Sequence, residues 1–157
     1  VIEVRGPNVF KGYWEMPEKS SKEFRENGFF ITGDLGTISE DGYVSIVGRS
    51  KDLIISGGYN IYPKEIEVFL DGLDGVLESA VIGIPHPDFG EGVVAVIVPQ
   101  SRAKLIQEDI MLKLKGQIAR FKHPKRIVLI DELPRNAMGK VQKKILRERF
   151  ARLFLLL

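Results

Sequence analysis

Two apolar segments near the middle of the chain constrain its fold more than any other feature. Residues 79–84 (SAVIGI) and 93–98 (VVAVIV) are short, and the stretch between them holds two prolines and two glycines. Short apolar runs bounded by turn residues are typical of buried strands. We predict that these two strands are antiparallel neighbours, and that residues 126–130 (RIVLI) form a third strand.

Helices are expected between and after these strands. Pro63 can open the first helix, because the first helical position needs no backbone N–H. Its apolar stripe comprises Ile66, Phe69, Leu70 and Leu73. Two more helices are expected at residues 107–119 and from residue 141 onward. The sequence therefore predicts the α+β class for residues 51–157, a small C-terminal domain in which helices cover a three-stranded sheet.

Residues 1–50 differ from the rest of the chain, because they are rich in turns and in short alternating segments. The Asp41-Gly42 pair, followed by YVSIV at residues 43–47, is a strong hairpin signal. These residues offer too few strands to close a core of their own. We expect them to be the β-rich C-terminal edge of a larger N-terminal domain.

Composition excludes several classes of protein and site. The net charge of +2 gives no general attraction to nucleic acid or acidic membranes, and no apolar run approaches the ~20 residues that span a bilayer. The chain has no cysteine, and its two histidines, His86 and His123, lie far apart, so we expect no metal site. These features predict a cytoplasmic protein without nucleic-acid or membrane partners.

Lys140 ends the run PRNAMGK at residues 134–140 and is the foremost candidate for a functional residue. A Gly-Lys pair can bring a compact positive charge close to a phosphate. A Walker A loop is excluded, because Pro134 stands where that motif needs glycine and Val141 follows the lysine where it needs Ser or Thr. Taken alone, a lysine in such a turn could equally be a solvated surface residue.

Asp34 and Arg49 are the next candidates. Asp34 ends the segment FITGD, and its carboxylate could accept hydrogen bonds from a ribose diol. Arg49 lies in the segment GRSKD and offers a rigid donor fork for hydroxyls or phosphates. Each residue also has a purely structural interpretation. Asp34 can be a turn aspartate that binds local backbone, and Arg49 can be one member of a mixed cluster of surface charges.

In this order and spacing, the three segments resemble the adenylate-forming superfamily, which comprises acyl-CoA synthetases, luciferases and peptide-synthetase adenylation domains. The resemblance covers nearly the whole chain and is most specific over residues 32–67. Segments 5–14, 57–67 and 134–143 are most similar to bacterial malonyl-CoA synthetases. The resemblance implies an ATP-dependent, AMP-forming acid–thiol ligase, active as the full-length protein and inactive as this portion alone.

The resemblance assigns nucleotide-binding and catalytic roles to three residues. Asp34 matches the residue that holds both ribose hydroxyls of ATP or AMP, and Arg49 matches a second ribose or phosphate contact. Lys140 matches the catalytic lysine that bridges the substrate carboxylate and the α-phosphate. The implied cofactors and substrates are ATP, Mg²⁺ and CoA.

The remaining roles concern the movement of the small domain and the second half-reaction. Lys51 matches the hinge between the large and small domains, where many relatives have Asp. Gly57, Gly58 and Tyr59 match the surface beside the pantetheine of CoA. Lys140 is also expected to be a substrate for a lysine acetyltransferase and deacetylase.

The acid substrate and the second acceptor stay open at this point. The resemblance favours a small acid such as malonate and a place in fatty acid metabolism, but the acid pocket is expected upstream, in an N-terminal adenylation domain of the same chain. One alternative is an adenylation domain that loads a carrier protein. Another is a non-catalytic interaction domain, which the joint presence of Asp34, Arg49, Gly58 and Lys140 argues against.

Overall fold

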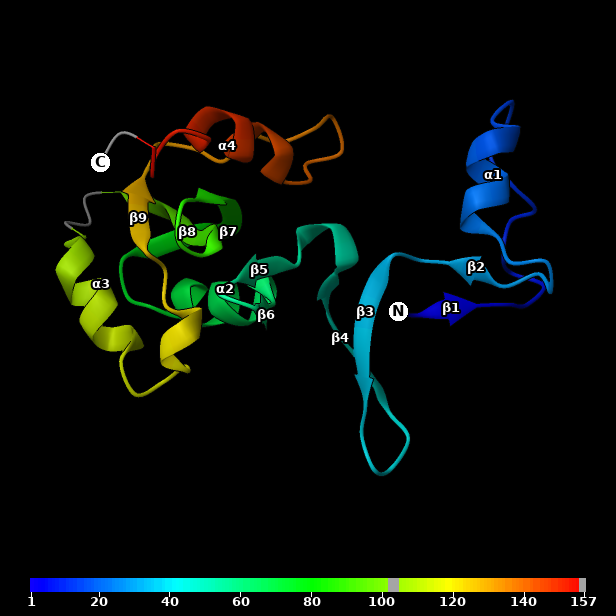
Figure 1. The fold of residues 1–157 in the computed structure, drawn as a ribbon, viewed down its shortest axis with the longest axis horizontal. Helices are drawn as coiled ribbons and strands as arrows, with labels where there is room; N and C mark the ends of the chain where they lie inside the picture. The colour runs from blue at the N-terminus through cyan, green and yellow to red at the C-terminus, as the bar shows by residue number, and fades with distance from the viewer. Residues whose placement is uncertain (102–104, 156–157) are drawn as a thin grey trace. The chain divides into compact units, whose positions relative to one another are not determined.

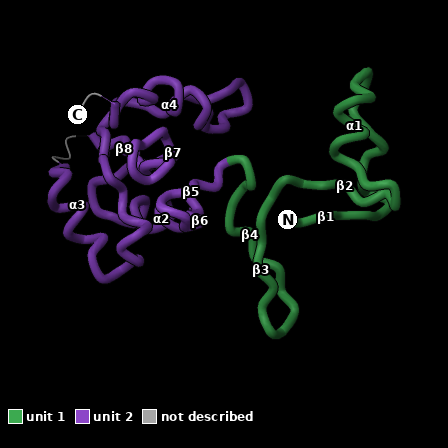
Figure 2. The backbone as a smooth tube through the Cα atoms, in the orientation of Figure 1, with its two compact units in different colours: residues 1–51 green, residues 52–157 purple. Residues whose placement is uncertain are grey.

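The structure is a computed structural model that describes residues 1–101 and 105–155. The chain divides into two compact units, residues 1–51 and residues 52–157 (Figure 2). The proposed assignment of residues 1–50 to the edge of a larger domain, and of residues 51–157 to a small mobile one, stays a prediction.

One mixed sheet forms the centre of the second unit (Figure 1). Its strands are β5 (Ile54–Ser56), β6 (Tyr59–Ile61), β7 (Val76–His86), β8 (Gly90–Pro99) and β9 (Arg126–Leu129). β7 and β8 form a long antiparallel hairpin, and β9 runs parallel to β8 along its other edge. The α+β class and the three predicted strands are confirmed. The sheet is wider than the three strands predicted, because the β5–β6 hairpin joins β8 at the pair Ser56 and Gly90.

Helices cover both faces of this sheet. Val93, Ala95 and Ile97 of β8 pack in one cluster with α2 (Pro63–Asp71) and α3 (Gln107–Leu114). The alternate residues of β8 pack in a second cluster with Leu146 of α4 (Lys143–Phe150). Because successive side chains point to opposite faces, a strand covered on both sides must be apolar throughout. The uninterrupted apolar run at residues 93–98 therefore reflects this two-sided cover.

Two predicted helix boundaries were wrong. The helix expected at residues 107–119 ends at Leu114, because Lys115 is extended and Gly116 takes a φ of +82°. The last helix begins at Lys143 rather than near Val141, because Val141 pairs with Arg135 as an isolated antiparallel bridge. Both predictions ran too far because the apolar side chains of the neighbouring segments continue the helical period, although their backbone is not helical.

The first unit consists of two small sheets and one helix. β1 (Glu3–Val4) pairs with β2 (Phe30–Ile31), and β3 (Asp34–Ile38) pairs with β4 (Val44–Arg49) around the expected turn. Helix α1 (Pro17–Glu23) was not predicted. None of residues 1–51, all of which the structure describes, has a buried side chain. The expectation that these strands cannot close a core alone agrees with this exposure.

Candidate functional site

Asp34 and Arg49 face each other across the β3–β4 hairpin. They are the first residue of β3 and the last of β4, they form a register pair, and Arg49 Nε lies 2.9 Å from Asp34 Oδ1. The hydroxyl of Thr32 accepts a hydrogen bond from the Asp34 N–H at 3.0 Å and donates one to the Ile2 carbonyl at 2.8 Å. The start of β3 is thereby tied to Ile2, the residue directly before β1.

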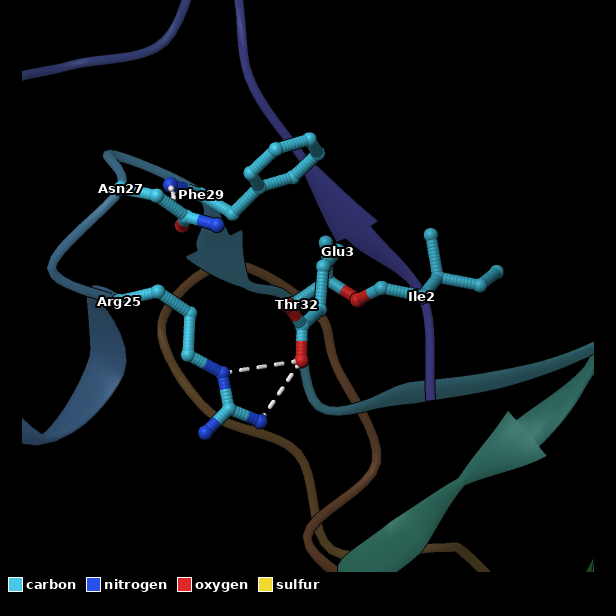
Figure 3. Close-up of polar contacts among 6 residues, drawn as sticks. All are labelled: Ile2, Glu3, Arg25, Asn27, Phe29 and Thr32. Atoms are coloured by element: carbon cyan, nitrogen blue, oxygen red, sulfur yellow. Dashed lines mark hydrogen bonds and ion pairs between the residues drawn. The ribbon is translucent and has the colours of Figure 1, made fainter.

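Figure 3 shows how that neighbouring strand is held in turn. Arg25 donates from Nε and Nη2 to the Glu3 carboxylate at 3.1 and 2.8 Å, and this hydrogen bonding lowers the pKa of the Glu3 carboxyl. Arg25 is exposed and Glu3 is partly exposed, so the pair contributes little to the stability of the unit and mainly orients β1.

An open pocket of about 600 Å³ lies beside the Asp34–Arg49 pair. Thr32, Lys51 and Tyr13 also line it. The Tyr13 hydroxyl donates to the Glu23 carboxylate at 2.5 Å, which raises the pKa of the phenol. The pocket thus presents the Asp34 carboxylate as an acceptor beside the Arg49 guanidinium as a donor, a combination suited to a ligand with both hydroxyls and negative charge.

Lys140 is exposed on a loop whose backbone is held at several points. The side-chain oxygen of Asn136 accepts hydrogen bonds from the N–H groups of Met138 and Lys140, at 3.0 and 2.9 Å. Asn136 N–H in turn donates to the Lys140 carbonyl at 2.9 Å, and Gly139 takes a φ of +76° in the turn. The lysine side chain is therefore exposed to solvent while its backbone is anchored.

Gly57 and Gly58 form the turn between β5 and β6, with φ values of +57° and +81°. A Cβ on Gly58 would meet no atom within 4 Å, so the space beside this glycine is open. Tyr59, the next residue, stacks on Phe121 with 4.5 Å between ring centroids, and both rings are partly exposed. The turn therefore presents bare backbone beside a flat aromatic surface.

The predicted site residues fall into three groups. Asp34, Arg49 and Lys51 line one pocket of the first unit. In the second unit, Gly57 and Gly58 of the β5–β6 turn form the second group together with Tyr59 at the start of β6, and Lys140 on its loop forms the third. Sequence reasoning missed Arg135, which donates to the Gly139 carbonyl and pairs with Glu78. Glu78 lies 57 residues from Arg135, so no local pattern could have indicated the pair.

Among the described residues, no group of three or more His, Asp or Glu side chains could hold a metal ion. No helix in the same part of the chain has the length and apolar character needed to cross a membrane.

Comparison with known proteins identifies the family. Residues 65–140 match the family model of the AMP-binding enzyme C-terminal domain. The chain is 46% identical to indoleacetate–CoA ligase of Aromatoleum aromaticum over 96% of its length, and 44% identical to feruloyl-CoA synthase of an Amycolatopsis species over 95%. The ATP-bound structure of MatB from Rhodopseudomonas palustris is similar over 97% of the chain, with 59% identity and a TM-score of 0.89.

These matches cover 29% of the Aromatoleum ligase, 30% of the Amycolatopsis synthase and 30% of MatB. Identity above 40% over nearly the whole chain, together with the family model, exceeds what a shared fold alone produces. The chain therefore belongs to the adenylate-forming superfamily and carries the C-terminal domain of an AMP-binding enzyme at residues 65–140.

Proposed function

We propose that the chain is the C-terminal portion of an AMP-forming acyl-CoA synthetase, which activates a carboxylic acid as an acyl-adenylate and transfers the acyl group to CoA. The single observation that carries the proposal is an exposed lysine, Lys140, on a loop whose backbone is anchored on both sides of it. An anchored loop can deliver a charge to a reacting phosphate without losing much conformational freedom on arrival.

Lys140 acts in the first half-reaction. A carboxylate that attacks the α-phosphorus of ATP brings two anions together, and a preorganised cation offsets both that repulsion and the charge that develops on the phosphoryl oxygens. Attack of the CoA thiol on the acyl-adenylate no longer needs this lysine. Acetylation of Lys140 removes its charge, so an acetyltransferase and a deacetylase could switch the enzyme at this position.

Asp34 and Arg49 hold the nucleotide. The Asp34 carboxylate accepts hydrogen bonds from the two ribose hydroxyls, and the Arg49 fork donates to a ribose or phosphate oxygen. Their 2.9 Å contact and the pocket beside them support this role. Mg²⁺ would accompany ATP as the counterion of its phosphates.

Lys51 is the hinge. The boundary between the two compact units falls directly after it. On one side, the Ser50 N–H and hydroxyl both donate to the Gly33 carbonyl, at 2.9 and 3.1 Å. On the other side, Asp52 accepts from Arg147 of α4 at 2.7 Å. A residue with anchored neighbours in two different units is well placed to absorb a change of backbone dihedrals between them.

Gly57, Gly58 and Tyr59 receive the pantetheine arm of CoA in the second half-reaction. Open space beside Gly58 and the stacked rings of Tyr59 and Phe121 support this role, because a thin chain can lie against bare backbone and a flat apolar surface. The basic stretch at residues 120–126 lies next to these rings and can attract the phosphates of CoA.

The acid is proposed to be small, with malonate as the first candidate and fatty acid metabolism as its setting. Resemblance of the motifs supports malonate, whereas the relatives named above act on indoleacetate and ferulate. The other partner is the N-terminal adenylation domain of the same chain, and the proposed location is the cytoplasm.

The experiment that tests the proposal uses the full-length protein with a panel of acids. Acid-dependent exchange of pyrophosphate into ATP, followed by thioester formation with CoA, is the expected result, and exchange should be strongest with malonate. Exchange that leads to a thioester only with a carrier protein would favour the carrier-loading alternative. Absence of exchange with every acid, in a protein that binds ATP, would contradict the ligase and favour an interaction domain.

A further inference from the structure

Arg135 joins the Lys140 loop to the central sheet. Its Nη1 donates to the Gly139 carbonyl at 2.6 Å, and its Nη2 pairs with the carboxylate of Glu78 on β7. The Glu78 side chain is 27% exposed and that of Arg135 is 44% exposed, so the contact lies at the edge of the sheet rather than in free solvent. One guanidinium thus connects the residue before Lys140 with a strand of the core.

Arg135 and Asn136 bind opposite ends of the peptide bond between Gly139 and Lys140. The Gly139 carbonyl and the Lys140 N–H are the two polar ends of a single peptide bond. Arg135 binds the carbonyl end, and Asn136 accepts from the N–H end at 2.9 Å. Because a peptide group is planar, holding both ends fixes the orientation of the plane from which the Lys140 Cα projects.

Asn136 and Arg135 do not contribute equally to that orientation. Asn136 is itself part of the loop, so its hydrogen bonds fix the shape of the loop but not its direction. Arg135 also belongs to the loop segment, but its fork reaches β7 through Glu78. A planar guanidinium offers two N–H groups in a fixed geometry, which lets it hold a carbonyl and a carboxylate at once.

We propose that Arg135 is a positioning residue for Lys140: with Glu78, it fixes the Gly139–Lys140 peptide relative to β7, so that the ammonium group enters the adenylation site in one orientation. The inference rests on the proposed role of Lys140. A small misplacement of a reacting or stabilising group can cost up to about 10²-fold in rate. Loss of Arg135 should therefore slow adenylation without altering the thiol step.

The test uses the full-length enzyme and compares the two half-reactions. Arg135→Met should reduce acid-dependent pyrophosphate exchange by about 10–10²-fold through kcat, and should leave thioester formation from supplied acyl-adenylate unchanged. The exchange rate of Arg135→Lys should lie between those of the unmodified enzyme and Arg135→Met, because an ammonium group keeps the charge but cannot reproduce the planar fork of the guanidinium. The matched control is Lys144→Met, which removes an exposed lysine of α4 that pairs with Glu148 at 3.8 Å, and which should leave both half-reactions unchanged.

A double-mutant cycle separates positioning from other roles. In a Lys140→Ala background, Arg135→Met should cause no further loss of exchange, since Arg135 acts only through that lysine. Losses that multiply in the double variant, or equal losses in both half-reactions with a lower melting temperature, would overturn the inference. If Arg135→Met does not fold, Glu78→Gln replaces it and should reduce exchange several-fold with normal thioester formation.

The two possible failures can be told apart. Normal exchange in Lys140→Ala would refute the proposed function of the lysine itself. Impaired exchange in Lys140→Ala together with normal exchange in Arg135→Met would leave that function intact and refute the positioning role alone.

Discussion

At the scale of single residues, Lys140 combines two properties that a charge-delivering group needs. Its side chain is exposed, and its backbone N–H and carbonyl are both bonded to Asn136. A solvated surface lysine needs only the first property. The proposed role also uses the second property, because an anchored backbone limits where the ammonium group can go.

The first prediction is that Lys140→Ala in the full-length enzyme reduces adenylate formation by about 10²–10³-fold, as removal of one preorganised donor does elsewhere. Thioester formation from supplied acyl-adenylate should continue at the normal rate. Pyrophosphate exchange and thioester synthesis measure the two steps, and Lys144→Ala on α4 serves as a control for loss of a nearby lysine. Equal loss of both steps would contradict the assignment. Enzymatic acetylation of Lys140 should reproduce the variant, and deacetylation should restore exchange.

The second prediction concerns Gly58. Gly58→Leu should block thioester formation and spare pyrophosphate exchange, because the new side chain would occupy the open space proposed for the pantetheine arm. The φ of +81° makes any side chain strained here, so a control for strain is needed. Gly116 has a φ of +82° and equally open surroundings in the same unit, which makes Gly116→Leu the matched variant. If both variants lose thioester synthesis alike, strain rather than obstruction is the cause.

At the scale of elements, a buried carboxylate joins α2, β7 and α4. Glu67 of α2 accepts a hydrogen bond from the Val81 N–H at 2.8 Å and pairs with Lys143 of α4 at 2.6 Å. Its side chain is only 9% exposed. Because α4 begins directly after the Lys140 loop, this contact also holds the end of that loop to the sheet.

The third prediction is that Glu67→Ala lowers the free energy of unfolding of the second unit by about 1–3 kcal/mol, since it leaves the buried Val81 N–H without its acceptor and removes the ion partner of the partly buried Lys143. Hydrogen exchange of the β7 and β8 amides measures this loss within the unit. Glu65→Ala is the control, because the Glu65–Lys122 pair is more exposed and its loss should cost at most about 1 kcal/mol. Similar costs for the two variants would contradict the structural role of the buried pair.

At the scale of the whole molecule, the chain divides into two compact units, and the boundary between them falls directly after Lys51. Ser50 is bonded within the first unit and Asp52 within the second, so the covalent path between two anchored residues runs through Lys51. If Lys51 is the proposed hinge, we expect a change of its backbone dihedrals rather than bending of either unit.

The fourth prediction is that Lys51→Pro in the full-length enzyme preserves pyrophosphate exchange and abolishes thioester synthesis. Proline fixes φ near roughly −65° and removes the N–H, which should trap the small domain in the adenylation arrangement that is reached first. Lys51→Ala should be normal in both steps, because it removes the side chain but keeps the dihedral freedom. Normal overall turnover in a well-folded Lys51→Pro enzyme would refute the hinge and the domain alternation proposed with it.

The sequence alone determined the elements that depend on local physics. Three kinds of local feature were predicted correctly: the strands at residues 79–84 and 93–98, the Asp41-Gly42 turn and the helix start at Pro63. Strand propensity, turn chemistry and the absence of an N–H on proline all act over a few residues. Helix α1 was missed because its sequence, PEKSSKE, carries no apolar stripe. The end of α3 and the start of α4 were misplaced because apolar side chains in the adjoining segments continue a helical period without helical backbone.

Only the tertiary structure decided how the candidate residues are held. The motif indicated Lys140, but the contact between Arg135 and Glu78 that ties its loop to β7 joins residues far apart in the sequence. The burial of Glu67 likewise depends on α4 near the other end of the chain. The Asp34–Arg49 contact depends on the register of the β3–β4 hairpin. A shift of one residue would turn the side chains of one strand to the opposite face and separate the pair. Residue types can be read along a chain, whereas contacts between distant segments form only when packing brings those segments together.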